Sequence, residues 1–372
     1  MKSRKLPETC FVFHDIDGSP WLASHLNALN EFYDHVVSVS LNKSNPRVRK
    51  LGEVPLNGVR EVSLRSFSGL PLVLKLLFRK CDIYAHGLRP TQISFFFAFF
   101  TSNNLFIFMH FSPILFNLPT YTRRKIRNTI NARLFSFALS KSKLLFVFSL
   151  ELSSYLLKNN ISPNRIRKIP LGITNFNLHE SQSRDESRIR ILMVGRLSQE
   201  KNYSYALNIL KRLRDIRSDF IVDIFGLGPL NTTLVSEIEN LDLHSIVTLQ
   251  GWKPEIIRLY SNYDLLLHTS HSEGYGQVIV EALMNNIKVF TSRVGVSIDL
   301  EMIGVYNLLT FDLNEPIELI VSNLNTFLDE DVFPLEKNFE FLQQHSLDNA
   351  VDAFREELSR YRNSLTSETE NS

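Results

Sequence analysis

The chain has 372 residues, 44% of them apolar and 22% charged, and a formal net charge of +2. This length and composition are typical of a globular protein with two domains that each bury a core. The longest apolar region, 93–118, is broken by polar residues into pieces too short for a membrane-spanning helix. Two distant cysteines without metal-ligand spacing exclude a disulfide framework and indicate a reducing compartment. No signal peptide is visible, so we expect a cytoplasmic protein.

The small net charge hides an asymmetry between the two halves. Residues 1–172 hold 24 Lys and Arg against 9 Asp and Glu, about +15, whereas the remainder holds 17 against 30, about −13. A basic first half favours an anionic partner, such as inner-leaflet lipid or a lipid diphosphate acceptor. Nucleic acid is not expected, because no recognition motif is present.

In the first half, alternating strands and helices predict a doubly wound domain. A strand over 10–14 leads into a loop, 15–19, that contains Gly18, and a helix is expected over 20–32. Further strands are expected over 36–40, 83–86, 105–109 and 144–148. His86 and His110 then fall at strand carboxyl ends, where such sheets bind ligands. A functional role is favoured for His110, and a structural one for His86.

A basic helix is predicted in the same half. Arg123, Arg124, Lys125, Arg127 and Arg133 recur with helical spacing among apolar residues up to Phe137. A basic amphipathic helix of this kind is a candidate membrane-surface element, peripheral on the inner face of the membrane. The alternative is a solvated helix face over an ordinary core.

The second half begins after a polar linker, 174–188. A buried strand over 189–194 ends at Gly195, Arg196 follows at once, and Lys201 lies near the start of a helix over 203–214. Two cations at the mouth of a strand–turn–helix unit can clamp a diphosphate. The next strands, 220–225 and 246–250, end in glycine turns, and Gly226 is a candidate donor-binding position.

The segment 270–286 carries the strongest functional signal. A strand over 265–268 precedes a glycine turn and a helix, with Glu273 before the turn and Glu281 in the helix. The backbone N–H groups of a helix start suit an anion, and carboxylates beside it suit sugar or ribose hydroxyls. This pattern indicates a nucleotide-sugar pocket, although a strand-to-helix turn with two solvated glutamates is the simpler alternative.

These motifs together resemble a known family. Residues 189–303 are similar to the donor domain of the retaining glycosyltransferases of family 4: GRLSQEKN matches Gly-Arg-Leu-x-x-x-Lys, and EGYGQVIVE matches Glu-x(7)-Glu. The resemblance implies that Arg196 and Lys201 bind the diphosphate, Glu273 faces the transferred sugar and Glu281 the ribose hydroxyls. It further implies roles for these positions: phosphate contacts at Gly276, Gln277 and Val278, a donor or leaving-group contact at His110, and a cleft position for Gly18.

The chain departs from the family pattern at four places, one of which is Pro170-Leu171-Gly172, where the family has a Pro-Asn-Gly hinge element. Asn285-Asn286 stands where the family usually has a glycine, and Arg293-Val294-Gly295-Val296 stands at a common Gly-Gly turn. The usual double glycine of the first loop is reduced to Gly18-Ser19. Asn tolerates a left-handed helix cap, so the helix end can survive the change at 285–286.

The resemblance implies the α/β GT-B fold, with two Rossmann-like, doubly wound parallel-sheet domains facing across a cleft. We expect a first domain over 1–173, the linker 174–188, a donor domain over 189–346, and a terminal helix over 347–372 that crosses back to the first domain and ends in a disordered tail. The expected activity is sugar transfer, with retention, from a nucleoside-diphosphate sugar to a glycan or lipid-linked acceptor. This places the protein in surface polysaccharide or glycolipid biosynthesis, with no cofactor and no essential metal. Alternatives are a catalytically silent nucleotide-sugar-binding partner and a GT-B epimerase or phosphorylase.

Overall fold

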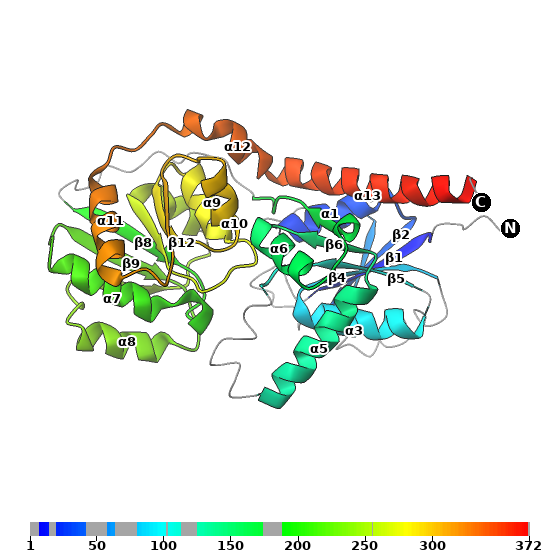
Figure 1. Ribbon diagram of the computed structural model, residues 1–372, viewed down its shortest axis with the longest axis horizontal. Helices are drawn as coiled ribbons and strands as arrows, with labels where there is room; N and C mark the ends of the chain where they lie inside the picture. Colours follow the sequence, from blue (N-terminus) through cyan, green and yellow to red (C-terminus); the bar gives the residue numbers. More distant parts are fainter. Residues whose placement is uncertain are drawn as a thin grey trace. The chain divides into compact units, whose positions relative to one another are not determined.

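The computed structural model describes residues 7–14, 20–41, 58–63, 80–101, 103–112, 125–173, 188–254 and 256–370, with backbone alone at 125–130 and 366–370. They form two compact units (Figure 1). The first unit contains the described residues up to 173 together with 345–370, and the second contains 188–344. The loop with Gly18, most of the linker, and Arg123 and Arg124 lie outside the described residues.

The first unit is built on a parallel sheet. Among its described residues, seven strands run in the order β3-β2-β1-β4-β5-β6-β7, and helices α1 and α13 lie on one side with α3 and α5 on the other (Figure 1). The elements in chain order are β1 (Thr9–His14), α1 (Pro20–Leu29), β2 (His35–Ser40), β3 (Val59–Ser63), β4 (Asp82–His86), α3 (Leu88–Phe100), β5 (Asn104–Phe108), α5 (Lys125–Lys141), β6 (Leu144–Val147), α6 (Leu150–Lys158), β7 (Ile166–Lys168) and α13 (Leu347–Glu370).

The terminal helix α13 belongs to the first unit. Its residue Phe354 is buried against the ring of His25 on α1, and Arg355 pairs with Glu31 at 2.6 Å. A side chain at Gly172 would come within 2.8 Å of the Leu347 Cα, so a glycine is needed where α13 begins. The expected disordered tail is wrong up to Glu370, because α13 continues that far. Extending an existing helix needs no new nucleus, and neither Pro nor Gly occurs in 363–370 to stop it.

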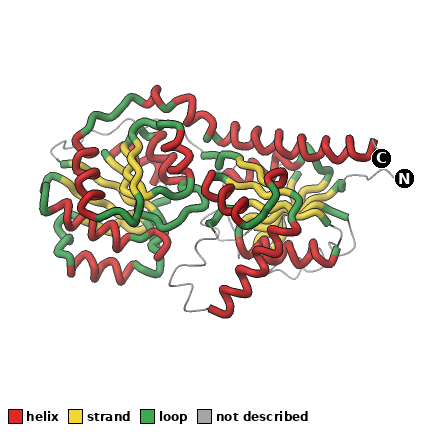
Figure 2. The backbone as a smooth tube through the Cα atoms, viewed as in Figure 1, coloured by secondary structure: helices red, strands yellow, loops and turns green. Residues whose placement is uncertain are grey.

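The second unit repeats the plan. Its described residues form a parallel sheet of six strands in the order β10-β9-β8-β11-β12-β13, and Figure 2 shows helices flanking these strands. The elements are β8 (Ile189–Val194), α7 (Tyr203–Arg214), β9 (Phe220–Phe225), α8 (Asn231–Asn240), β10 (Val247–Gly251), β11 (Leu265–His268), α9 (Gln277–Met284), β12 (Lys288–Ser292), α10 (Val296–Met302), β13 (Leu308–Phe311), α11 (Ile317–Asp329) and α12 (Phe339–Gln344).

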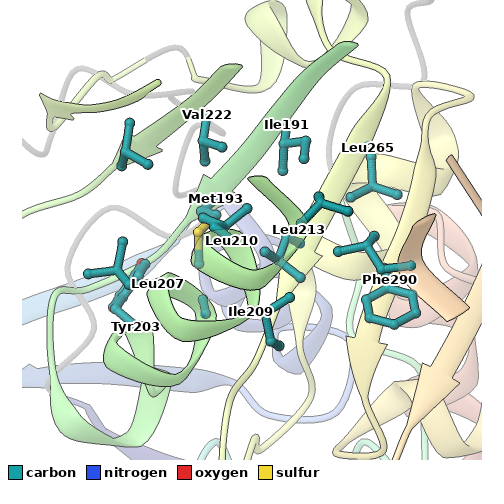
Figure 3. Packing of buried hydrophobic residues seen from close by; sticks show 14 of the residues in the cluster. Ile191, Met193, Tyr203, Leu207, Ile209, Leu210, Leu213, Val222, Leu265 and Phe290 are labelled. Carbon is teal, nitrogen blue, oxygen red and sulfur yellow. The ribbon is translucent and has the colours of Figure 1, made fainter. Parts of the chain in front are cut away.

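Apolar residues from β8 and α7 explain why the second unit holds its strand ends in place. Ile191 and Met193 point from one face of β8 toward Leu207 and Leu210 of α7, and all four are buried (Figure 3). The strand has a side-chain period of two and the helix a period near 3.6, so each presents one apolar face. Burial of this core fixes where β8 ends, and therefore where Arg196 and Lys201 lie.

Candidate active site in the second unit

Glycines bring two loops together beside the end of β8. The Cβ of any residue at 226 would lie 1.8 Å from the Gly195 carbonyl oxygen, and one at 228 would lie 2.2 Å from the Leu197 oxygen. Only glycine permits such an approach of two backbones. Hydrogen bonds then close the contact: Leu197 N donates to the Leu227 oxygen at 3.1 Å. Gly226 therefore shapes the loop that carries Arg196.

A pocket of about 350 Å³ opens at this loop pair. Its walls come from the ends of β8, β9 and β10 and from the short 3-10 helix 256–262; the lining residues are Val194, Gly195, Arg196, Phe225, Gly226, Leu227, Trp252, Lys253 and Ile256. Arg196 is exposed and makes no ion pair with any described residue. Trp252 is 54% exposed, so the pocket offers an aromatic face as well as two cations. This combination suits a ligand with a planar ring and an anionic group.

Lys201 and Glu273 meet although 72 residues separate them in the chain. The ammonium group of Lys201 donates to Oε1 of Glu273, with both side chains mostly buried. Lys201 also lies against Gly195 of the pocket wall, where a Cβ would be 3.4 Å from the Lys201 Cε. Glu273 in turn lies next to Gly276, the residue before α9. The two predicted motifs thus converge at the same edge of the sheet.

His268 and Ser270 complete the network around Glu273. The Ser270 hydroxyl donates to Glu273 Oε1 at 2.7 Å, and His268 Nε2 lies 3.0 Å from the same oxygen. The other ring nitrogen of His268 is hydrogen-bonded to the Thr291 hydroxyl at 2.9 Å. Burial lowers the pKa of His268 below its usual value, and the nearby Glu273 carboxylate only partly opposes this shift. His268 therefore acts as a neutral imidazole that orients Glu273.

Glu273 is held as a carboxylate. Burial alone would raise its pKa, but the Lys201 charge and the His268 hydrogen bond outweigh burial, so the pKa lies well below its usual range. Glu281 has the opposite balance: burial raises its pKa, while hydrogen bonds from Tyr260 and Gln277 partly oppose the rise. These bonds measure 2.9 Å from Tyr260 and 2.7 Å from Gln277. The two glutamates therefore differ in charge preference and in partners.

The turn before α9 has the geometry that the sequence predicts. Gly276 adopts a left-handed conformation with φ 94°, and α9 begins at Gln277, so the N–H groups of Gln277 and Val278 lie in its first turn. Gly295 packs on this turn, because a Cβ there would come within 2.3 Å of the Tyr275 oxygen. Asn286 has φ 55° after α9, so asparagine does supply the left-handed cap that the family takes from glycine.

His110 belongs to the first unit, apart from this network. Its Nε2 is hydrogen-bonded to Nδ1 of His86 at 3.0 Å, and burial lowers its pKa to about 3. His86 is fully buried, and its Nε2 has no partner among the described residues. The preference for a structural role at His86 agrees with this burial. His110 itself is partly exposed at the carboxyl end of β5.

Sequence reasoning missed several residues of the site. The sequence pattern places His268 only at the end of a strand and predicts no role for Ser270 or Tyr260. Trp252 follows a glycine at a strand end, which was a usable signal for a pocket wall. In the part of the chain described, no group of three His, Cys, Asp or Glu is arranged to hold a metal ion, and no helix is long and apolar enough to cross a membrane.

Comparison with known proteins finds a family match over this site. Residues 175–339 match the family model described as Glycosyl transferases group 1. This region is similar to the domain that the model describes. It contains the Arg196–Lys201 and Glu273–Glu281 motifs. The chain as a whole has the GT-B fold, as its structural neighbours do.

Two solved structures illustrate the fold. The Anabaena protein Alr3699/HepE in complex with UDP and glucose has a TM-score of 0.72 at 17% identity, covering 95% of this chain and 100% of that one. The lipopolysaccharide outer core galactosyltransferase WaaB has a TM-score of 0.68 at 14% identity, covering 95% and 99%. At these identities the likeness concerns the fold alone.

Curated relatives match a smaller part of this chain than the solved structures do. The phosphatidylinositol N-acetylglucosaminyltransferase GPI3 subunit of Saccharomyces cerevisiae is 24% identical over 250 residues, 62% of this chain and 52% of that protein. The sulfoquinovosyl transferase SQD2 of Arabidopsis thaliana is 26% identical over 142 residues, 36% and 27% of the two chains. The match thus spans about half the length of the yeast relative, and less of the plant one.

Proposed function

We propose that the protein is a glycosyltransferase that moves a sugar, with retention, from a nucleoside-diphosphate sugar to a glycan or lipid-linked acceptor. The observation that carries the proposal is Arg196, a cation without an ion-pair partner among the described residues, on the wall of a pocket that also exposes Trp252. Retention rests on the family resemblance of the two motifs. A surface polysaccharide or glycolipid is the product class we favour, since the yeast GPI3 subunit is by name part of a phosphatidylinositol N-acetylglucosaminyltransferase.

The site residues divide the work of binding and catalysis. Arg196 and Lys201 bind the diphosphate, and their attraction to it grows as negative charge develops on the leaving group. Glu281, beside Tyr260, accepts hydrogen bonds from the ribose hydroxyls, which keep a buried carboxylate ionised when the ligand is present. Glu273, kept anionic by Lys201 and His268, faces the sugar.

Residues of the first unit enter the proposal more weakly. We propose that His110, as a neutral imidazole, hydrogen-bonds the donor sugar or the leaving group, in keeping with its lowered pKa. Gly18 stays a predicted donor contact in a loop outside the described residues. We propose that no metal and no cofactor is essential, because the clamp cations come from Arg196 and Lys201.

Binding is tested first with free nucleotides. UDP, GDP and ADP are compared for the rise in melting temperature that each produces, with UDP the first probe because HepE was solved with it. One diphosphate should stabilise the wild type clearly more than the corresponding monophosphate does. If no nucleotide stabilises the protein, the donor assignment fails.

The two glutamates are then separated by calorimetry. Glu281→Gln should weaken binding of the bare nucleoside diphosphate, since an amide accepts two hydroxyl bonds less well than a carboxylate. Glu273→Gln should spare nucleotide binding and depress transfer. The control is Glu239→Gln, an exposed carboxylate on α8. Equal affinity losses at 273 and 281 would contradict the division of roles, and conversion of the donor into an epimeric nucleotide sugar without an acceptor would favour an epimerase.

A further inference from the structure

Five large apolar side chains are exposed together on the first unit. Phe96, Phe99 and Phe100 of α3 are 58%, 56% and 63% exposed, and Leu134 and Phe137 of α5 are 42% and 43% exposed. We call these five residues the aromatic ledge. Monomeric soluble proteins rarely leave a contiguous apolar patch of this kind uncovered, so the ledge calls for a partner.

The ledge is one surface rather than scattered residues. The rings of Phe99 and Phe100 meet edge to face with centroids 5.2 Å apart, and the ring of Phe137 is tilted against Phe99 at 6.2 Å. Phe96 and Phe100 lie 4.7 Å apart. The buried Phe95 lies 5.2 Å from Phe137 and anchors the contact between α3 and α5. Rings held by buried neighbours present a preformed apolar surface and need little ordering on contact with a partner.

The segment that carries the ledge has charge of one sign. Residues 83–150 contain no Asp or Glu in 68 positions, yet they hold eight Lys and Arg. On α5, Arg133 and Lys141 are exposed one turn either side of Phe137, and the Lys141 ammonium lies 5.8 Å from the Phe137 ring centroid. Lys143 is exposed just after the helix. The apolar patch is therefore bordered by cations and by no carboxylate of its own segment.

We propose that the aromatic ledge inserts into the headgroup–acyl boundary of an anionic lipid bilayer while Arg133, Lys141 and Lys143 contact the acidic headgroups. Aromatic rings and long cationic side chains are the residues that favour this boundary. A second copy of the chain is a poorer occupant, because a two-fold contact would oppose these cations to themselves. The proposal rests on the proposed function for its purpose, since a lipid-linked acceptor is met at such a surface.

This surface overlaps only part of the one that the sequence predicts. The predicted basic helix runs from Arg123 to Phe137. The side chains of its first four cations, Arg123, Arg124, Lys125 and Arg127, lie outside the described residues, whereas Arg133, Leu134 and Phe137 are exposed. The aromatic ledge adds an apolar component from α3, whose phenylalanines belong to the apolar region 93–118 of the sequence. Phe95 is buried and Phe96, Phe99 and Phe100 are exposed, because six apolar residues in a row, 95–100, cannot all point inward from one helix.

The test is co-sedimentation with vesicles of phosphatidylcholine alone or mixed with phosphatidylglycerol, without any sugar substrate. Wild type should bind the acidic vesicles and dissociate as salt rises. The triple variant Phe96→Ser, Phe99→Ser, Phe100→Ser should bind at least about tenfold more weakly. Its matched control replaces Met302, Ile303 and Phe339 with Ser, because these three side chains of the second unit are also more than half exposed; this control should bind as wild type does.

A charge arm separates the two components. Arg133→Gln, Lys141→Gln and Lys143→Gln together should lower binding and flatten its salt dependence, whereas Lys211→Gln, Arg212→Gln and Lys337→Gln in the second unit should not. Both ledge variants should keep the melting temperature and the nucleotide affinity of wild type, so a failure here is distinct from a failure of the donor assignment. Equal binding to neutral vesicles, unchanged binding of the Ser variant, or a Ser variant that loses self-association instead would overturn the proposal.

Discussion

The two units place a histidine at equivalent edges of their sheets but surround it differently. His268 ends β11 with both ring nitrogens hydrogen-bonded, to Thr291 and to Glu273. His86 ends β4 with one nitrogen bonded to His110, and the other has no partner among the described residues. Position at a strand carboxyl end therefore does not by itself make a catalytic group. The partners differ: His268 is bonded to a carboxylate, whereas His86 is bonded to a second imidazole.

The setting of the first-unit histidines explains the contrast. The ring centroids of His25 and His86 lie 5.0 Å apart, in an aromatic cluster with Phe108 and Phe354. Both ring nitrogens of His25 lack hydrogen-bond partners among the described residues. Burial lowers the pKa of His25 to about 3. In the second unit, by contrast, Lys201 and Glu273 provide opposite charges that a network can use. In the first unit these polar groups lie in an aromatic core, and in the second unit they lie next to a pocket.

The largest effects should come from the cations of the second unit. Arg196→Ala and Lys201→Ala should each lose about 2–4 kcal/mol of transition-state stabilisation, measured as kcat/KM for transfer or donor hydrolysis. Only Lys201→Ala should also lower the melting temperature, because it leaves the Glu273 carboxylate without its buried cation, whereas Arg196 is exposed. Near-normal turnover in either variant would contradict the assignment of that residue to the diphosphate clamp.

The glycine contact that shapes the pocket can be broken alone. Gly226→Ala sets a Cβ 1.8 Å from the Gly195 oxygen, so the loops must part, at a cost of about 1–3 kcal/mol in unfolding free energy. Gly251→Ala is the matched control, because φ there is also positive but nothing lies within 4 Å. Denaturant unfolding of both variants decides. If Gly226→Ala costs no more than Gly251→Ala, the close approach does not support the site.

Acid stability tests the first unit. The pKa of His25 is lowered to about 3 by burial, so the unfolded chain takes up a proton near its ordinary value of about 6.5 while the folded chain does not. The stability that the neutral His25 contributes is complete above pH 6.5. It falls as the pH drops toward the folded pKa, by about 2 kcal/mol at pH 5. His25→Phe should remove this loss.

The control for acid stability is an exposed histidine of the second unit. His244→Gln changes a side chain that is 67% exposed and should leave the slope of unfolding free energy against pH as in wild type. Urea unfolding at several pH values measures all three proteins. A His25→Phe variant with the wild-type acid slope would show that this imidazole is not a neutral filler.

The smallest effect concerns a hydroxyl in the second unit. Tyr203 is 3% exposed, and its hydroxyl has no partner among the described residues. A Cβ at Gly195 would lie 3.1 Å from that hydroxyl, which places it just behind the pocket wall. We expect Tyr203→Phe to lower nucleoside-diphosphate affinity by about 1 kcal/mol. This is the value of the one hydrogen bond that the hydroxyl would make to the bound nucleotide.

Tyr205→Phe is the control for this hydroxyl, since Tyr205 is on the same helix and packs against the same core. Calorimetric titration compares the two variants with wild type. Unchanged affinity in Tyr203→Phe would mean that the unpaired tyrosine resembles His25, and the contrast between the two units would weaken.

The sequence by itself determined most of the fold. The strand over Ile189–Val194 and the helix over Tyr203–Arg214 have the bounds that their apolar periodicity predicts. The turn at Gly276 is likewise predictable, because its conformation depends on a few neighbouring residues. Strand β3 (Val59–Ser63) was not predicted, since a short, partly polar edge strand has little periodicity and forms only by pairing with β2.

Tertiary structure alone decided how the site and the surfaces are assembled. Lys201 meets Glu273, and Tyr260 meets Glu281, only because parallel strands end at one sheet edge. The burial that separates the pKa of Glu273 from that of Glu281, and the exposure that turns Phe99 into part of a surface, depend on what packs nearby. Local sequence specifies backbone conformation and apolar faces, whereas solvation and partners are properties of the folded chain.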